Sequence, residues 1–283
     1  MSAYKSFAVI GAGTIGLPIV EALAARNASV VLLSRPGSSK KTIPAGVPVI
    51  EVDFTNVPAL SAALQEHKVD VVLSTVGTKG LDVQRALVDA AKLAGVKLFA
   101  PSEYGFPTEG QTEGVLGEKM QIIDQLRQLG IPTVQFYTGL FTEVIPLVTG
   151  YNQHGKIRII GKGEAFASFT AIADIAGFVA YVLTTLPPAK LENREFRIEG
   201  ERARMKDLGE IFNTTVEHLD QVPKEEADPD LLTMLLEALG SGVGSTGWDV
   251  VNNREGSGAD GAGSANVLWP GHHWKSIKEV LKL

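Results

Sequence analysis

The chain has 283 residues, of which 45% are hydrophobic and 20% are charged, so it is long and apolar enough to bury a sizeable core. Its formal net charge of -6 argues against a nucleic-acid partner, and the absence of cysteine excludes disulfides, thiol catalysis and cysteine-ligated metals. The N-terminus shows no signal-peptide pattern, and no apolar run approaches the roughly 18 residues that span a bilayer. We therefore expect a cytoplasmic monomer or homodimer without a membrane or nucleic-acid partner.

In the first half of the chain, short apolar runs alternate with amphipathic segments. Runs with the continuous apolar character of strands buried on both faces cover residues 7–10, 30–33, 47–52, 69–75, 96–101 and 131–137. Helical segments lie between most of them, over residues 14–26, 57–67, 81–94 and 113–129. This rhythm predicts an α/β fold in which helices cover both faces of a doubly wound parallel sheet.

After about residue 150 the rhythm changes. The sequence predicts a strand or hairpin followed by a helix over residues 172–184, a strand over 194–200, helices over 204–218 and 227–239, and a short amphipathic C-terminal helix. Residues 240–264 hold eight glycines and few apolar side chains, and we expect them to form a flap that orders when a ligand binds. We expect a first domain over residues 1–150 and a smaller α/β region over 151–283 that is interleaved with it.

Between the first predicted strand and helix, "VIGAGTIG" places Gly11, Gly13 and Gly16 in the spacing G-x-G-x-x-G. In this context the first glycine permits a tight turn, the second lets a pyrophosphate approach the backbone, and the third lets helix and strand pack closely. Thr14 and Ile15 lie at the start of the helix, where free N–H groups and the helix dipole attract phosphate. The loop therefore predicts a Rossmann dinucleotide-binding domain over residues 1–150.

The end of the second predicted strand indicates which dinucleotide binds. NAD sites usually carry Asp or Glu there, which binds the ribose 2′-hydroxyl. Here Ser34 and Arg35 occupy that position, with Lys40 and Lys41 nearby, and a guanidinium binds a 2′-phosphate through two parallel hydrogen bonds. A solvated basic loop is the simpler alternative, but the position at the strand end favours NADPH over NADH. We expect Asp53, which follows the third strand, to contact the adenine edge.

Five segments carry a family resemblance: "GAGTIGLPIVEAL", "DVVLSTVG", "LFAPSEYG", "GEKMQIIDQLRQLGIPTVQFYTGLF" and "TAIADIAGFVAYVL". Over roughly residues 6–200 the chain resembles the NmrA-like, isoflavone-reductase-like branch of the atypical short-chain dehydrogenases. That branch includes phenylcoumaran benzylic ether reductases, pinoresinol-lariciresinol reductases and eugenol synthases. The plant reductases usually have a G-x-x-G-x-x-G loop, which is one residue longer than the loop in this chain.

The resemblance implies roles for particular residues. It makes Lys119 the catalytic lysine and residues 151–283 the substrate-binding region beside the NADP-binding domain. The cofactor contacts that it implies beyond the glycine loop are Arg35 and Lys40 at the 2′-phosphate, Ser74, Thr75, Val76 and Gly77 beneath the cofactor, and Ser102 and Tyr137 near the nicotinamide.

Lys119 also stands out by its position on the predicted helix 113–129. One stripe of that helix, spaced by four and three residues, consists of Val115, Lys119, Ile122, Leu126 and Leu129. A lysine in an apolar row can lay its methylenes along the stripe and extend its ammonium to solvent. Alternatively, the ammonium lies in a partly desolvated cleft, where a lowered pKa lets it act as an acid or base near neutral pH. With the family match, we favour the second interpretation.

Other catalytic patterns are absent from the sequence. No tyrosine has a lysine four residues later, so the usual Tyr-x-x-x-Lys pair of short-chain dehydrogenases is missing; Tyr151 and Lys156 differ from that spacing by one residue. The five histidines, including the adjacent His272 and His273, show none of the spacing of a metal site, so we expect no metal.

Two functions fit these observations. The first is an NADPH-dependent reductase of a small, aromatic or otherwise conjugated molecule, with Lys119 as the acid or base. The second is a regulator of the NmrA type, which senses the dinucleotide without turnover. The lysine favours the enzyme, because a regulator has no evident need for it.

Overall fold

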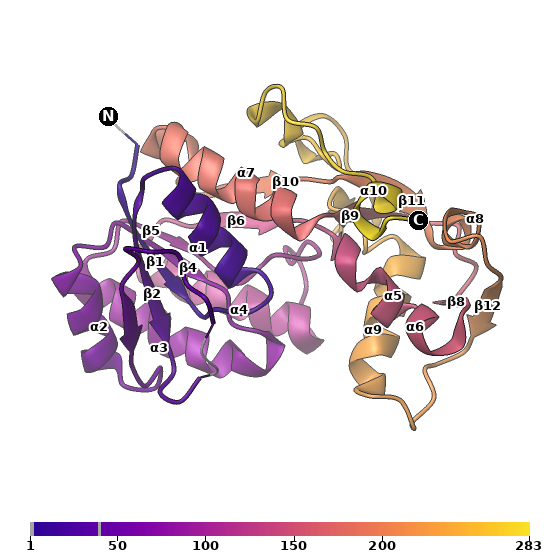
Figure 1. Ribbon diagram of the computed structural model, residues 1–283, viewed down its shortest axis with the longest axis horizontal. Helices are drawn as coiled ribbons and strands as arrows, with labels where there is room; N and C mark the ends of the chain where they lie inside the picture. Colours follow the sequence, from indigo (N-terminus) through magenta and orange to yellow (C-terminus); the bar gives the residue numbers. More distant parts are fainter. Residues whose placement is uncertain (1–2, 39–40) are drawn as a thin grey trace. The chain divides into compact units, whose positions relative to one another are not determined.

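The structure is a computed structural model that describes residues 3–38 and 41–283 (Figure 1). The chain divides into two units, each made of several segments. The first unit comprises Met1–Glu103, Gly110–Phe136 and Ala176–Phe196, and the second comprises Tyr104–Glu109, Tyr137–Ile175 and Arg197–Leu283. This division differs from a boundary at residue 150, because residues 137–150 belong to the second unit and residues 176–196 return to the first.

The first unit is built on a parallel sheet with strand order β3-β2-β1-β4-β5. Its strands are β1 (Ser6–Ile10), β2 (Ser29–Ser34), β3 (Val49–Glu51), β4 (Val71–Ser74) and β5 (Leu98–Ala100). A parallel bridge between Phe99 and Thr133 leads on to β6 (Val134–Tyr137), which pairs with β10 (Arg194–Arg197). The chain winds outward from β1 in one direction and then from β4 in the other, so the topological switch point lies between β1 and β4. The predicted doubly wound α/β fold is confirmed.

Helices cover both faces of this sheet (Figure 1). They are α1 (Gly16–Ala25), α2 (Val57–Glu66), α3 (Leu81–Ala94), α4 (Gly114–Gln128) and α7 (Ile172–Thr185). Helices α2, α3 and α4 share one core with alternate strand residues such as Ala8 and Ile10. On the other face α1 meets α7, where the Arg26 guanidinium lies 5.0 Å from the centre of the Tyr181 ring. Each fully buried aliphatic or aromatic side chain in such a core stabilises the fold by about 1.5–3 kcal/mol.

The second unit has smaller sheets. A three-stranded sheet has the order β11-β9-β7, β12 pairs in parallel with β8, and β13 and β14 form a hairpin. These strands are β7 (Leu140–Phe141), β8 (Ile157–Ile160), β9 (Phe166–Thr170), β11 (Glu201–Arg204), β12 (Val216–Leu219), β13 (Trp248–Asp249) and β14 (Arg254–Glu255). The helices are α5 (Ile145–Val148), α6 (Tyr151–His154), α8 (Leu208–Ile211), α9 (Pro229–Ser241) and α10 (Ile277–Leu281). No helix in residues 3–38 and 41–283 combines the length and the apolar character needed to cross a membrane.

The helix predicted over residues 204–218 is wrong in its second half. Helix α8 ends at Ile211, Asn213 adopts the left-handed region with φ of 50°, and Val216–Leu219 forms β12. The β-branched run Thr214, Thr215 and Val216 favours an extended backbone, and pairing with β8 completes the strand.

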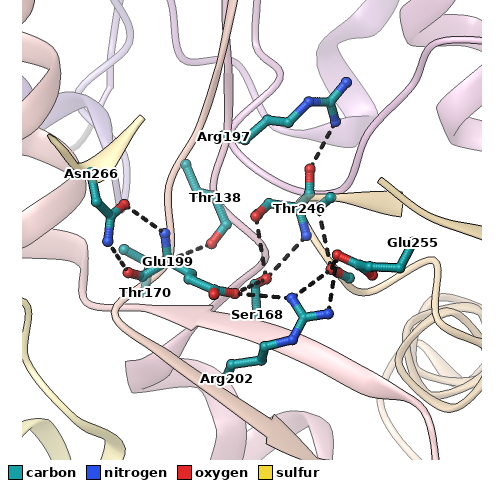
Figure 2. A network of polar contacts seen from close by, with 11 residues as sticks. Thr138, Ser168, Thr170, Arg197, Glu199, Arg202, Thr246, Glu255 and Asn266 are labelled. Atoms are coloured by element: carbon teal, nitrogen blue, oxygen red, sulfur yellow. Dashed lines mark hydrogen bonds and ion pairs between the residues drawn. The ribbon is translucent and has the colours of Figure 1, made fainter. Parts of the chain in front are cut away.

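The glycine-rich segment 240–264 is anchored at its start by buried polar contacts (Figure 2). The backbone N–H of Thr246 donates to Ser168 Oγ at 3.0 Å, and Arg197 Nη1 donates to the Thr246 carbonyl oxygen at 2.8 Å. Gly247 is required there, because a Cβ would overlap the backbone nitrogen of Ala262. Residues 244–247 are therefore packed in place, and the expectation of a flap stays a prediction only for the exposed stretch around residues 251–260.

Candidate dinucleotide and proton-transfer site

A cavity of about 750 Å³ lies in the first unit, where β1, β2 and β4 end. Ligands of doubly wound sheets bind at this carboxyl edge, beside the switch point. Seven of the predicted cofactor residues line the cavity: Gly11, Gly13, Ser34, Arg35, Thr75, Val76 and Gly77. Three segments that are far apart in the sequence thus meet at one site, as the parallel topology requires.

The glycine loop has a fixed shape that leaves room for a ligand. Gly11 has φ of 100°, which few residues with a side chain adopt, and a Cβ at Gly16 would overlap the Gly11 carbonyl oxygen. Thr75 Oγ1 donates to the carbonyl oxygens of Ile10 at 2.9 Å and Gly11 at 3.0 Å, which ties the loop to the end of β4. Gly13, in contrast, is exposed, and a Cβ there would meet nothing within 4 Å.

These observations fit a bound pyrophosphate. The N-terminus of α1 follows the loop, and its N-cap residue Ile15 supplies no side-chain hydrogen bond to the first turn. The positive dipole end of α1 therefore remains available to an anion, while the Leu17 N–H donates to the Gly13 carbonyl oxygen at 3.3 Å. Thr14 is exposed beside this helix end, whereas Ile15 and Gly16 are buried and support the loop from below.

The other end of the cavity is polar and largely basic. Ser34 and Arg35 line it together with Ser38 and Lys41, which follow them in the chain. A guanidinium and an ammonium at the end of β2 suit a 2′-phosphate, as the sequence predicts. Lys40, predicted to assist, lies outside the described residues.

The acidic residue in the cavity wall is Glu51, not Asp53. Asp53 turns away to cap its own turn, where Oδ1 accepts hydrogen bonds from Thr55 N at 2.9 Å and Thr55 Oγ1 at 2.8 Å. These two bonds lower the pKa of Asp53 below its ordinary value. The predicted adenine contact is therefore not supported by the geometry, and the apolar wall beside Glu51 is formed by residues such as Phe54.

Sequence reasoning missed Glu51 because its place depends on strand register. Glu51 pairs with Ser34 across β2 and β3, which brings its carboxylate level with the basic end of the cavity. The strand predicted to continue to residue 52 ends at this residue. Parallel strands end at one edge of a sheet, so a correct prediction of the end of β3 would have placed Glu51 at the cavity.

Beyond the cavity, the "PSEYG" segment is held by hydrogen bonds to its neighbours. Ser102 Oγ donates to the carbonyl oxygen of Val76 at 2.7 Å, and Ser102 N donates to Gln84 Oε1 at 2.8 Å. Since Val76 lines the cavity, this segment adjoins it, although Ser102 itself is not part of the lining. Ser74 is fully buried at the end of β4 and supports the site without facing it.

Lys119 lies on α4, where the predicted apolar stripe is present, with Ile122 and Leu126 buried. Its Nζ donates to the backbone carbonyl oxygen of Glu103 at 3.2 Å. Burial lowers the pKa of Lys119 below its ordinary value, and the nearby Glu103 carboxylate opposes that effect. The ammonium thus does not extend freely into solvent, which favours the functional interpretation of this lysine.

Tyr137 belongs to the second unit and is fully buried there. Its hydroxyl lies 3.3 Å from Thr108 Oγ1, and the Arg197 guanidinium lies 5.1 Å from the centre of its ring. Its expected contact with the nicotinamide stays a prediction. Among the residues that the structure describes, no three histidine or carboxylate side chains gather as metal ligands would.

The sequence profile of the NmrA-like family matches residues 4–238. The chain belongs to this family. Oxidoreductase aprR of Aspergillus flavus is 33% identical over 213 residues, which cover 71% of this chain and 70% of that protein. Isoflavone reductase homolog P3 of Arabidopsis thaliana is 30% identical over 196 residues, which cover 62% of this chain and 63% of that protein. These relatives confirm the predicted enzyme class, an oxidoreductase.

Among solved structures, the binary complex of leucoanthocyanidin reductase with NADPH from Vitis vinifera superposes with a TM-score of 0.78. The two chains are 20% identical, and the match covers 98% of each. At this identity the likeness supports the fold: the Rossmann sheet and the second unit are both shared with that reductase.

Proposed function

We propose that the protein is an NADPH-dependent reductase of a small, aromatic or otherwise conjugated molecule, and that Lys119 exchanges the proton of the reaction. The observation that carries this proposal is the lysine itself. The resemblance described above implies that it is the family's catalytic lysine, and its ammonium is partly desolvated and tethered to the Glu103 carbonyl oxygen.

NADPH suits the cavity of the first unit. Gly11 and Gly13, with the N-terminus of α1, would hold the pyrophosphate, and Arg35 with Lys41 would hold the 2′-phosphate. The leucoanthocyanidin reductase complex, which holds NADPH on the same fold, supports this choice. Glu51, on the same wall, would face the adenine-ribose end, where a carboxylate can accept hydrogen bonds.

Bound NADPH would supply the hydride. Negative charge then develops on the reduced substrate, and a nearby ammonium both stabilises that charge and donates a proton to it. An ordinary lysine holds its proton too tightly for efficient transfer near neutral pH, whereas burial brings the pKa of Lys119 down toward that range. The carbonyl oxygen of Glu103 fixes the direction in which the ammonium points.

The substrate class is supported by the relatives. One is named as an isoflavone reductase homolog and a structural neighbour as a leucoanthocyanidin reductase, and both names refer to small aromatic molecules. A conjugated acceptor also suits a site with one proton-exchanging lysine, because conjugation spreads the charge that hydride addition creates.

The test is a turnover assay with NADPH and a panel of aromatic enones, enols and benzylic ethers. The loss of reduced-nicotinamide absorbance measures turnover. We expect multiple turnovers with at least one compound, and much slower turnover with NADH. Tight NADPH binding without oxidation on any compound would contradict the proposal and favour a dinucleotide-sensing regulator.

A further inference from the structure

We propose that Glu103 is a positioning residue for the reaction: its backbone carbonyl orients the Lys119 ammonium, and its buried carboxylate governs the proton exchange of that ammonium. This inference rests on the proposed role of Lys119. It assigns a specific task to a carboxylate that lies in the "PSEYG" segment and contacts neither of the cofactor's phosphate sites.

Glu103 is held in a rigid place. Its side chain and backbone have no exposed surface, and its N–H donates to the Pro101 carbonyl oxygen at 2.8 Å. The preceding residue, Ser102, is fixed by Gln84 on α3 and by Val76 in the cavity wall. Two hydrogen bonds and the peptide bond between Ser102 and Glu103 therefore link Val76 in the cavity wall to Lys119.

Two opposing effects act on the ammonium. Burial favours the neutral amine, while the Glu103 carboxylate favours the charged form. The carbonyl oxygen at 3.2 Å accepts a hydrogen bond that is strongest when the amine is protonated. Without the carboxylate, burial would favour the neutral amine unopposed; with it, the charged form of Lys119 persists to higher pH.

Two charged groups of the neighbouring helix α3 contact residues of α4 other than Lys119. On α3, Arg85 donates to Gln121 at 2.7 Å, and Asp89 accepts from Gln125 at 2.9 Å. Glu118, beside Lys119 in the chain, is exposed to solvent, where its charge is screened. Tyr104, next to Glu103, stays neutral because burial raises the pKa of its hydroxyl.

The experiment measures the proton affinity of Lys119 directly, by NMR of the full chain with isotope-labelled lysine, and assigns its signal by comparison with Lys119→Arg. In Glu103→Gln, which keeps the size of the side chain, we expect the titration midpoint of Lys119 to move down by about one pH unit or more, the scale for loss of a close opposite charge. Glu118→Gln is the matched control. This substitution also removes one negative charge, but from the solvent-exposed face of the helix that carries Lys119. We expect it to move the titration midpoint of Lys119 several times less.

The pH profile of kcat separates this inference from the proposed function. If both hold, the profile moves with the Lys119 midpoint in Glu103→Gln and not in Glu118→Gln. An unchanged midpoint in Glu103→Gln overturns the inference. A moved midpoint with an unmoved kcat profile keeps the coupling but overturns the catalytic role of Lys119. If Glu103→Gln does not fold, Glu103→Asp is the second variant, because it moves the carboxylate away by one methylene. An unchanged titration midpoint of Lys119 in Glu103→Asp also overturns the inference.

Discussion

Alanine substitutions at Gly13 and Gly16 should separate cofactor binding from folding. A Cβ at Gly13 would meet no protein atom within 4 Å, and Gly13 lines the cavity. Gly13→Ala should therefore leave the free energy of unfolding within about 1 kcal/mol of the parent, since Gly→Ala at an unstrained site changes it by about 0.4–1 kcal/mol. The added methyl group would fill the space through which the pyrophosphate reaches the backbone.

The cost to binding can be estimated from overpacking. Forcing one extra methyl group into a close contact costs about 1–3 kcal/mol. That range corresponds to roughly a 5- to 150-fold weaker affinity for NADPH. NADH should weaken by the same factor, because both dinucleotides share the pyrophosphate.

Gly16→Ala should instead lower the stability of the fold. Its Cβ would overlap the Gly11 carbonyl oxygen and Thr75 Oγ1, and a hydrogen bond between these two atoms holds both in place. We expect a loss of about 3 kcal/mol in unfolding free energy, at the upper end of the overpacking range. Urea unfolding followed by circular dichroism and titration calorimetry with NADPH measure the two quantities. A Gly13→Ala variant that binds NADPH as tightly as the parent would refute the assignment of the glycine loop.

Three charged groups, Arg35, Glu199 and Glu279, give further predictions. Arg35→Ala should weaken NADPH binding by about 1.5–3 kcal/mol, the scale for hydrogen bonds to charged groups, and leave NADH nearly unchanged; equal losses for both cofactors would contradict the 2′-phosphate assignment. Burial raises the pKa of Glu199 although Ser168 and Arg202 oppose it, so its contribution to stability is full below the ordinary value of 4.5 and falls as pH rises through the folded pKa. The unfolding midpoint of the parent relative to Glu199→Gln should therefore fall with rising pH. Glu279 should behave oppositely, because hydrogen bonds from Ser276 N, His273 and Ser276 Oγ lower its pKa to about 2, so the advantage of the parent over Glu279→Gln is lost as pH falls from 4.5 toward 2. Denaturant melts across this range measure both, and slopes of the same sign would contradict the argument.

The sequence predicted those parts of the fold that depend on local patterns. The helix expected over residues 81–94 is α3 with both ends unchanged, because Gly95 follows it with φ of 72° as a helix C-cap. The glycine loop was equally predictable, since its three glycines, the strand before them and the helix after them lie within one short stretch of sequence. The helix predicted over residues 204–218 was wrong in its second half because strand pairing with β8 overrode the helical pattern.

The site was predictable to the same extent. Lys119 could be found from its place in an apolar stripe, but its contact with Glu103 could not, since the two residues meet only when α4 packs beside the end of β5. Asp53 was predicted because it follows the third predicted strand, whereas Glu51 lies at the end of β3 itself, and this difference of two residues decides which one lines the cavity. Which residue lines the cavity depends on where the strand ends, and local β-propensity predicts strand ends poorly.

The central claim is that Lys119 exchanges a proton during the reaction, and the most direct test is kcat for Lys119→Ala and Lys119→Arg with NADPH and a substrate found in the panel. General acid–base catalysis contributes about 10²–10⁴-fold, so alanine should lower kcat by about 100-fold or more while NADPH affinity changes little. Arginine should not rescue, because a guanidinium keeps its charge but cannot release a proton near neutral pH. Arginine that restores most of the activity, or alanine that leaves kcat unchanged, would contradict the claim.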